Sequence, residues 1–115
     1  MVIMDTRMLL EYSHTLRNRY LEQLSQLSWE EVTKSRGASF DSLRNIFMHM
    51  VDNEDMMINY VIPGRVKEWV RRSPEEFSDV DSITKRVREV ESKTNAYVAK
   101  IKPAELEKKV EVARP

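Results

Sequence analysis

Two histidines and one glutamate in this chain have the types and positions that could carry chemistry: His14, His49 and Glu54. Asp52 and Asn53 follow His49 by three and four positions, which places them on the same face of a helix. Imidazole and carboxylate groups bind zinc and nickel, but a stable site needs three or more ligands in a fixed geometry. The residues around His49 therefore favour a hydrogen-bonded histidine at the edge of a bundle over a metal ligand.

Glu54 is unusual because it falls within an apolar stripe, about 20° from Leu43 and Val61 on a helical wheel. A carboxylate that loses hydration without gaining cations or hydrogen bonds is easier to protonate and can act as a general base. The interpretation that we favour is a structural acid bonded to a neighbouring helix. The candidate partners on that helix are Tyr12, Ser13 and Tyr20.

The geometry of one helix separates these candidates from each other. Glu54 lies five positions after His49, which corresponds to roughly 140° around a helix, so the two cannot chelate one ion within a single turn. His14 lies beside Leu10 and Leu21, away from the main apolar stripe of its helix, and is expected at an interface or on the surface. His49 and Glu54 are therefore not predicted to chelate one ion together, and His14 is not predicted to be a ligand.

Composition excludes several classes of function. The chain has no cysteine, which excludes disulfides, thiolate metal sites and a cysteine nucleophile. It also contains no glycine-rich phosphate loop, nucleophile elbow or zinc-protease helix motif. Methionines are frequent, with seven in the chain, and they are more typical of irregular cores than of cofactor sites.

Charge and hydropathy limit the partners that we expect. With 19 basic and 19 acidic side chains the formal net charge is zero, which argues against a strong non-specific nucleic-acid binder. The basic segment 65–72 surrounds Trp69 and is expected to be a solvated connector with one anchoring tryptophan. No apolar run approaches the roughly 20 residues that span a bilayer, and no signal peptide is visible at the N-terminus. We expect a cytoplasmic protein without membrane contact.

The elements that carry these residues are predicted to be helices within a single domain over residues 1–115. Two glycines and four prolines are too few for the turns of a β-sandwich or barrel. Helices are expected at about 6–27, 40–61 and 82–101, with Asp5 and Ser39 as caps of the first two. A short turn should follow Ser28, and another should start at Ser73 with proline in its first position. The fold class is therefore all-α.

Apolar stripes at helical spacing predict the buried faces. The second helix carries a second apolar edge that includes His49, so it should contact neighbours on two sides. On the third helix, Lys85, Arg86, Glu89, Lys93 and Lys100 are expected to face solvent. The stripes expected to be buried are Leu9, Tyr12, Ser13, Leu16, Tyr20, Leu24 and Leu27 on the first helix, Leu43, Phe47, Met50, Glu54, Met57 and Val61 on the second, and Ile83, Val87, Val90, Thr94, Tyr97 and Ile101 on the third.

Three helices with this much apolar surface are one helix short of a closed bundle. Each large buried side chain contributes roughly 2 kcal/mol, whereas ordering each residue costs about 1–2 kcal/mol, so the stripes need dense mutual burial. We expect that a partner subunit covers the surplus face or that the natural protein continues past Pro115, which would make this chain incomplete at its C-terminus.

Five segments together resemble the DinB-like family of four-helix bundles. They are residues 11–21 (EYSHTLRNRYL), 27–31 (LSWEE), 38–44 (ASFDSLR), 49–54 (HMVDNE) and 81–106. They match, in order, the family's first helix, its leucine-serine-x-glutamate-glutamate turn, the cap of its second helix, the histidine followed five residues later by glutamate, and its third helix. No segment is highly specific alone; the order and spacing carry the resemblance, which covers nearly the whole chain.

The resemblance implies an up-down-down-up bundle, often homodimeric, with a divalent metal bound by three histidines in many members. His49 matches the histidine of the second helix. The other two form a histidine-x-x-x-histidine pair on the fourth helix, which this chain lacks, so the site cannot be completed within these residues and no tight metal binding by this chain alone is expected. A metal such as zinc or nickel would belong to the complete protein.

Two functions follow as hypotheses. The first is a divalent-metal-dependent hydrolase or thiol transferase, in which the metal lowers the pKa of a bound water or thiol substrate and His49 is one ligand. The second is a non-enzymatic helical module that pairs with another subunit, with a homodimer as the expected assembly. Glu54 is a weak catalytic candidate in the first hypothesis. The residues do not identify a small-molecule substrate for it.

Overall fold

The computed structural model describes residues 6–37 and 41–101, and these residues form helices and no strands. The α-helices are α1 (Thr6–Ser25), α2 (Trp29–Thr33), α3 (Leu43–Met56) and α4 (Val80–Lys100). A π-helical turn, η1 (Met57–Val61), continues α3, and the 3₁₀ turns η2 (Val66–Glu68) and η3 (Pro74–Glu76) lie in the connection to α4. The predicted all-α class is confirmed for the described part of the chain.

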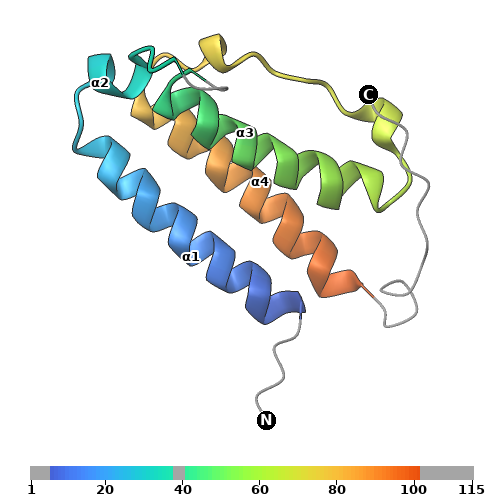
Figure 1. The fold of residues 1–115 in the computed structure, drawn as a ribbon. Coiled ribbons are helices and arrows are strands. Elements are labelled where there is room, and N and C mark those ends of the chain that lie inside the picture. The colour runs from blue at the N-terminus through green and yellow to red at the C-terminus, as the bar shows by residue number, and fades with distance from the viewer. Residues whose placement is uncertain (1–5, 38–40, 102–115) are drawn as a thin grey trace.

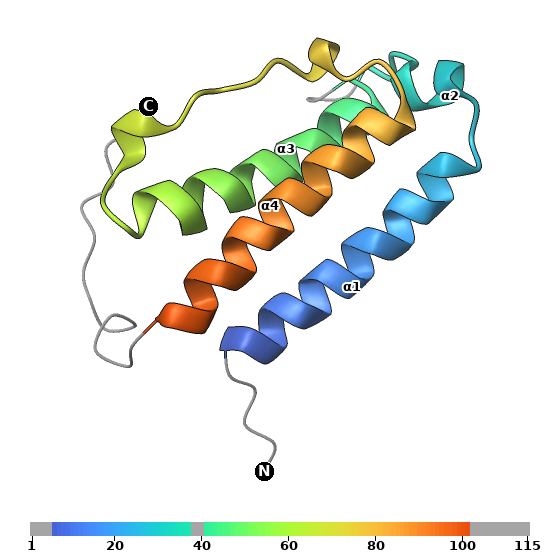
Figure 2. The same cartoon turned by 180° about the vertical axis from the view of Figure 1, so that it is seen from behind.

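The long helices form a layer in which α4 lies between α1 and α3 (Figures 1 and 2). Followed along the chain, α1 runs toward the end of the molecule that carries α2, while α3 and α4 both run away from that end (Figure 1). The parallel course of α3 and α4 requires a return connection, and residues 62–79 make it along the outer side of α3. Helix α4 is therefore the element that both other long helices pack against.

Side-chain caps define where the helices begin. The Ser28 hydroxyl accepts a hydrogen bond from the backbone N–H of Glu31 at the start of α2, as predicted from the sequence. The cap of α3 is Ser42, which accepts from the Asn45 N–H at 3.1 Å, so the prediction of Ser39 as the cap was wrong. Ser39 and the other predicted cap, Asp5, lie outside the described residues.

Helix α4 begins earlier than predicted. The Asp79 carboxylate accepts a hydrogen bond from the Ser82 N–H at 2.8 Å, and the Ser82 hydroxyl completes a reciprocal capping box. The predicted turn at Ser73 is present as η3, with Pro74 in its first position. Gly64 follows η1 with φ of 81°, a conformation that glycine adopts without the steric cost of a side chain.

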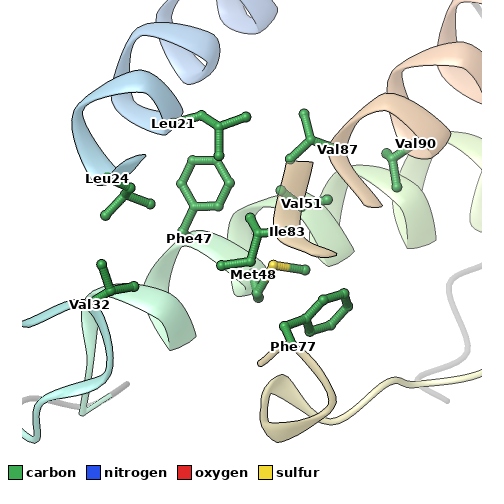
Figure 3. Close-up of a cluster of buried hydrophobic side chains, with 10 residues drawn as sticks. All are labelled: Leu21, Leu24, Val32, Phe47, Met48, Val51, Phe77, Ile83, Val87 and Val90. Atoms are coloured by element: carbon green, nitrogen blue, oxygen red, sulfur yellow. The ribbon is translucent and has the colours of Figure 1, made fainter. Parts of the chain in front are cut away.

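The apolar core lies at the α2 end of the layer (Figure 3). Phe47 and Met48 from α3 meet Ile83 and Val87 from α4, and Phe77 from the connector closes the cluster from below. Complete removal of such side chains from water contributes roughly 1.5–3 kcal/mol each. The buried cluster consists of Leu21, Leu24, Val32, Phe47, Met48, Val51, Phe77, Ile83, Val87 and Val90.

The predicted stripe of the third long helix is largely confirmed, because Ile83, Val87, Val90 and Thr94 are fully buried. Arg86, which was predicted to face solvent, is instead 7% exposed. It can be buried because it pairs with carboxylates of α3, which sequence periodicity does not reveal. The prediction of a solvated connector holds for Lys67 and Arg71, which are exposed, and the anchoring Trp69 is half-buried.

The predicted stripe of the first helix was wrong as a buried face. Leu24 is buried, but Leu9, Tyr12, Tyr20 and Leu27 are between 43% and 59% exposed. The face of α1 that packs inward is rotated by a quarter turn and consists of His14, Arg17, Leu21 and Leu24. On α3 the buried face also takes in Met48, Val51 and Asp55, while Met50 of the predicted stripe is exposed. The most apolar stripe of α1 therefore faces outward, whereas Phe47 of α3 and Val61 of η1, both in the predicted stripe of the second helix, are buried as predicted.

None of the helices in the described residues is both long enough and apolar enough to cross a membrane.

Candidate functional site: a buried polar network

Glu54 is the centre of a polar network that joins all three long helices. Its Oε1 atom lies 2.9 Å from the Nε2 atom of His14 and accepts a hydrogen bond from Nη1 of Arg17 at 3.0 Å, both on α1. Its Oε2 atom accepts a hydrogen bond from the hydroxyl of Thr94 on α4 at 2.8 Å. The expected bonding of Glu54 to a neighbouring helix is confirmed, but the partners are not Tyr12, Ser13 or Tyr20.

The network extends along the contact between α1 and α4. The Arg17 guanidinium lies 3.8 Å from the Glu91 carboxylate, which also accepts a hydrogen bond from Asn18 at 3.1 Å. Arg88 donates to the Asn18 side chain at 2.8 Å. Arg17 is only 6% exposed, so its charge is compensated by the carboxylates of Glu54 and Glu91 and not by water.

Thr94 and Asn59 connect Glu54 to a second group of charges, the Asp55 cluster, which consists of Asp55, Asn59, Arg86 and Lys93. Asn59 donates to Thr94 and to Asp55, both at 3.2 Å. Asp55 lies 2.9 Å from the Arg86 guanidinium and 2.8 Å from the Lys93 ammonium of α4. Asp55 is 2% exposed, and each of its carboxylate oxygens, which is shielded from water, pairs with a cation or accepts a hydrogen bond from an amide.

The π-helical turn η1 helps to assemble this cluster. An inserted residue in a helix shifts the direction of the following side chains, and such π turns are frequent at functional positions. Asn59 and Val61 in η1 are both buried, and Asn59 reaches Thr94 across the α3–α4 contact. The prediction of an uninterrupted α-helix to Val61 missed this change of direction.

Arg86 of the Asp55 cluster and its neighbour Asp52 show how burial changes the pKa of charged groups. Burial alone would lower the pKa of Arg86, but the charge and hydrogen bond of Asp55, with Asp52, raise it above its ordinary value. Burial raises the pKa of Asp52, and the attraction of Arg86 offsets this only in part. The nearest Arg86 nitrogen is 3.5 Å from Oδ1 of Asp52, and that oxygen has no hydrogen-bond partner among the described residues.

The network also forms one wall of a cleft between α1 and α4. This cleft has a volume of about 570 Å³, and His14, Glu11 and Glu91 are among the residues that line it. An imidazole that is oriented by a carboxylate can transfer protons, as in many hydrolases. Here, however, Glu54 also accepts hydrogen bonds from Arg17 and Thr94, so its contacts connect the helices and are structural. His14 is 7% exposed and contacts Glu54 of α3, so of the two expected places, an interface or the surface, the surface is excluded.

His49 is exposed on α3. Asp52, its neighbour at i+3, is directed toward Arg86. Among the described residues, no group of three or more histidine, cysteine, aspartate or glutamate side chains is arranged to hold a metal ion. The role of His49 as a metal ligand therefore stays a prediction.

An exposed apolar surface lies beside the polar network, and we call it the α1–α3 face. Exposed fractions in this face range from 38% for Ile46 to 59% for Tyr12. A groove of about 430 Å³ between α1 and α3 belongs to it, with apolar walls that include Leu16 and Met57 and with Glu54 and Arg17 among its lining residues. The exposed members of the face are Leu9, Tyr12, Tyr20, Leu27, Ile46 and Met50.

The structure brings His14 and Glu54 together, although sequence analysis treated them as unrelated. Asp55, Arg17 and the buried role of Arg86 were missed altogether. A signal for Asp55 existed, because Asp55 follows Met48 and Val51 by seven and four positions and therefore shares their face of the helix.

Comparisons with known proteins found no matching family model, no matching curated protein and no matching solved structure.

Proposed function

We propose that this protein is a helical interaction module that associates with a second copy of itself through the α1–α3 face. The observation that carries the proposal is the outward orientation of the apolar stripe of α1, together with the exposed Ile46 and Met50 of α3. Exposed apolar patches at the upper end of the range found on monomers are often functional, because covering them removes apolar surface from water. The polar network beneath the face supports this assignment, since its groups bind one another and hold the helices in place.

The size of the face suits a dimer. Its six exposed side chains together present on the order of 600 Å² of mostly apolar surface, near the upper end for patches on monomers. A specific interface buries about 800 Å² on each partner, and about 65% of a homodimer interface is apolar, which amounts to roughly 500 Å². A second copy, which carries an equal face, therefore matches the area that must be covered.

We further propose that the chain has the DinB-like fold, with the position of the fourth helix taken by the partner. Three long helices that run up, down and down support this proposal, as does the long return connection between α3 and α4. The position left open by these helices is the groove between α1 and α3. The fourth helix of an up-down-down-up bundle would run there parallel to α1.

A metal-dependent activity is the second candidate function. His49 precedes Met50 and lies one turn from Asn53, so it borders the α1–α3 face. A segment that covers the face could therefore bring further ligands to His49 and complete a zinc or nickel site there. Such a metal would lower the pKa of a bound water or thiol substrate. Glu54 takes no part in this proposal, because both its oxygens already accept hydrogen bonds.

Sedimentation velocity over a range of concentrations tests the association. We expect wild-type protein to sediment as a dimer at micromolar concentration and Tyr20→Lys to sediment as a monomer. Val70→Lys is the matched control, because Val70 is also apolar and exposed but lies in the connector. A wild-type monomer at all concentrations, or equal dimerisation of the two variants, would refute the proposed interface.

Metal content tests the second candidate. Untagged wild-type protein and His49→Ala would be purified in parallel and analysed for bound zinc and nickel. If a segment that covers the face completes the site, the wild type retains metal and the variant loses it. Equal metal content in the two proteins would remove His49 from any site.

A further inference from the structure

The α1–α3 face consists of a ridge and a groove that lie side by side. Leu9, Tyr12, Leu16 and Tyr20 follow one another at spacings of three and four residues, which is the pattern of a helix–helix seam. We call these four residues the ridge of α1: Leu9 and Tyr12 are exposed, and Leu16 and Tyr20 also form the α1 wall of the groove. The groove runs next to the ridge, between α1 and α3, with a volume of about 430 Å³.

The groove suits apolar side chains and does not suit a charged ligand. Both oxygens of Glu54 at its base are already bonded, to His14, Arg17 and Thr94. The Nε and Nη2 atoms of Arg17 lack hydrogen-bond partners among the described residues, but they are shielded from solvent and cannot be reached from the groove. A ligand would therefore find apolar walls, and little of its affinity could come from charge.

A surface with a ridge beside a groove is self-complementary. In a twofold dimer each patch meets the same patch on the other subunit. Rotation by 180° about an axis parallel to the helices places each ridge over the groove of the other copy. The alternative twofold axis lies in the plane of the face but perpendicular to the helices. Rotation about that axis would place ridge against ridge and leave both grooves empty. The first arrangement covers more apolar surface.

We infer that α1 of the second copy lies in the groove, parallel to α1 and in register with it, so that α1, α3 and their two counterparts form an intermolecular four-helix bundle. This inference rests on the proposed self-association and specifies its geometry. The incoming α1 is antiparallel to α3, which sets their helix dipoles in the favourable opposed orientation. Each ridge residue then lies opposite its own copy across the twofold axis.

Engineered cysteines test this geometry, because the wild-type chain contains none. A disulfide requires Cα atoms about 4.4–6.8 Å apart, which in-register parallel helices provide at seam positions. We expect Leu9→Cys and Tyr20→Cys each to form disulfide-linked dimers with themselves on oxidation. Both positions are already more than half exposed, so neither change should prevent folding. The control is Ser92→Cys, at an exposed position of α4 on the side of that helix opposite its buried residues.

The possible outcomes separate the geometry from the association. Linkage only in a mixture of Leu9→Cys with Tyr20→Cys would indicate antiparallel helices and overturn the inference. Equal linkage of Ser92→Cys would indicate random collision and would also overturn it. Dimers that sediment normally under reducing conditions but do not cross-link at either ridge position would refute this geometry alone. Monomers under reducing conditions would refute the proposed association itself.

Discussion

Near α2 the three long helices pack through apolar side chains such as Phe47, Met48 and Ile83. Further along α3 and α4 the same helices are joined by the polar contacts of Glu54 and Asp55. Apolar contact is non-directional and contributes free energy in proportion to the area removed from water. Buried ion pairs contribute less, because the cost of desolvation offsets much of their attraction.

The difference shows that stability and registration are supplied by different regions of this molecule. Hydrogen bonds fix distance and angle, so the Glu54 contacts with His14, Arg17 and Thr94 permit only one alignment of the helices. A polar inner face on α1 also leaves its apolar stripe available on the outside. The polar region thus connects the internal structure of the subunit to the surface that we propose for association.

The largest effect is expected at the apolar end, where Phe47→Ala should destabilise the protein by about 3–5 kcal/mol. Phe47 is 5% exposed, and the change removes most of its contacts and leaves a cavity beside Leu21 and Ile83. Urea unfolding followed by circular dichroism measures the loss. Val70→Ala, at an exposed position, should change stability by no more than about 0.5 kcal/mol. A loss below about 1 kcal/mol for Phe47→Ala would contradict the assignment of the stabilising core.

At the polar end, Asp55→Ala should cost about 3 kcal/mol, because it leaves Arg86 buried without its main counter-charge. The double variant Asp55→Ala with Arg86→Met should recover most of this loss, since neither buried charge then remains. Urea unfolding of both variants provides the comparison. With Arg86→Met measured as well, a double variant as unstable as the sum of the two single losses would show that Asp55 and Arg86 are not coupled, against our interpretation.

The exposed pair of Glu31 and Arg36 serves as the control for Asp55. Its two charged groups lie 3.1 Å apart in solvent, a comparable separation without burial. Glu31→Ala should therefore change stability by less than about 1 kcal/mol. An equal loss at both sites would show that burial is not the cause of the effect.

A smaller loss, about 2 kcal/mol, is expected for Glu54→Gln, because the amide keeps the shape of the side chain but no longer offers a charged acceptor to Arg17. Thermal unfolding measures it, with Glu22→Gln at an exposed position of α1 as the matched control. Cross-linking of the Tyr20→Cys protein in the Glu54→Gln background would show whether registration of α1 also depends on this network. Unchanged stability would mean that the Glu54 contacts do not hold the helices.

The smallest effect concerns Asp52, and it depends on pH. Because burial raises the pKa of Asp52, the folded state binds its proton more readily than the unfolded state. The group therefore favours the folded state most at low pH, and this contribution is lost as the pH rises through the folded pKa. Asp52→Asn, which cannot become charged, should be more stable than the wild type at pH 7, by up to about 1 kcal/mol.

The same comparison at pH 3 provides the check on this assignment. Below the ordinary aspartate pKa of about 4 the wild-type carboxyl is protonated in both states, so the advantage of Asp52→Asn should disappear. A variant that is less stable than the wild type at pH 7 would show that the attraction of Arg86 outweighs the burial of Asp52.

Much of the local structure could be predicted from the chain. The scarcity of breakers, the caps at Ser28 and Ser73 and the stripe from Ile83 to Thr94 predict helices that the structure contains. The candidate site was predicted only in part. Glu54 was identified by its position in an apolar stripe, but its partners were not, because a carboxylate has many possible partners on a neighbouring helix.

What the sequence determined by itself is the helical character of the chain and the excess of apolar surface on its first two long helices, because both depend on residue types at short, regular spacing. Only the tertiary structure decided which stripes face inward, since rotation of a helix about its axis depends on contacts from distant parts of the chain. Arg17, Asp55 and Arg86 are buried because each finds opposite charges on another helix. Periodicity along one helix carries no information about such pairs.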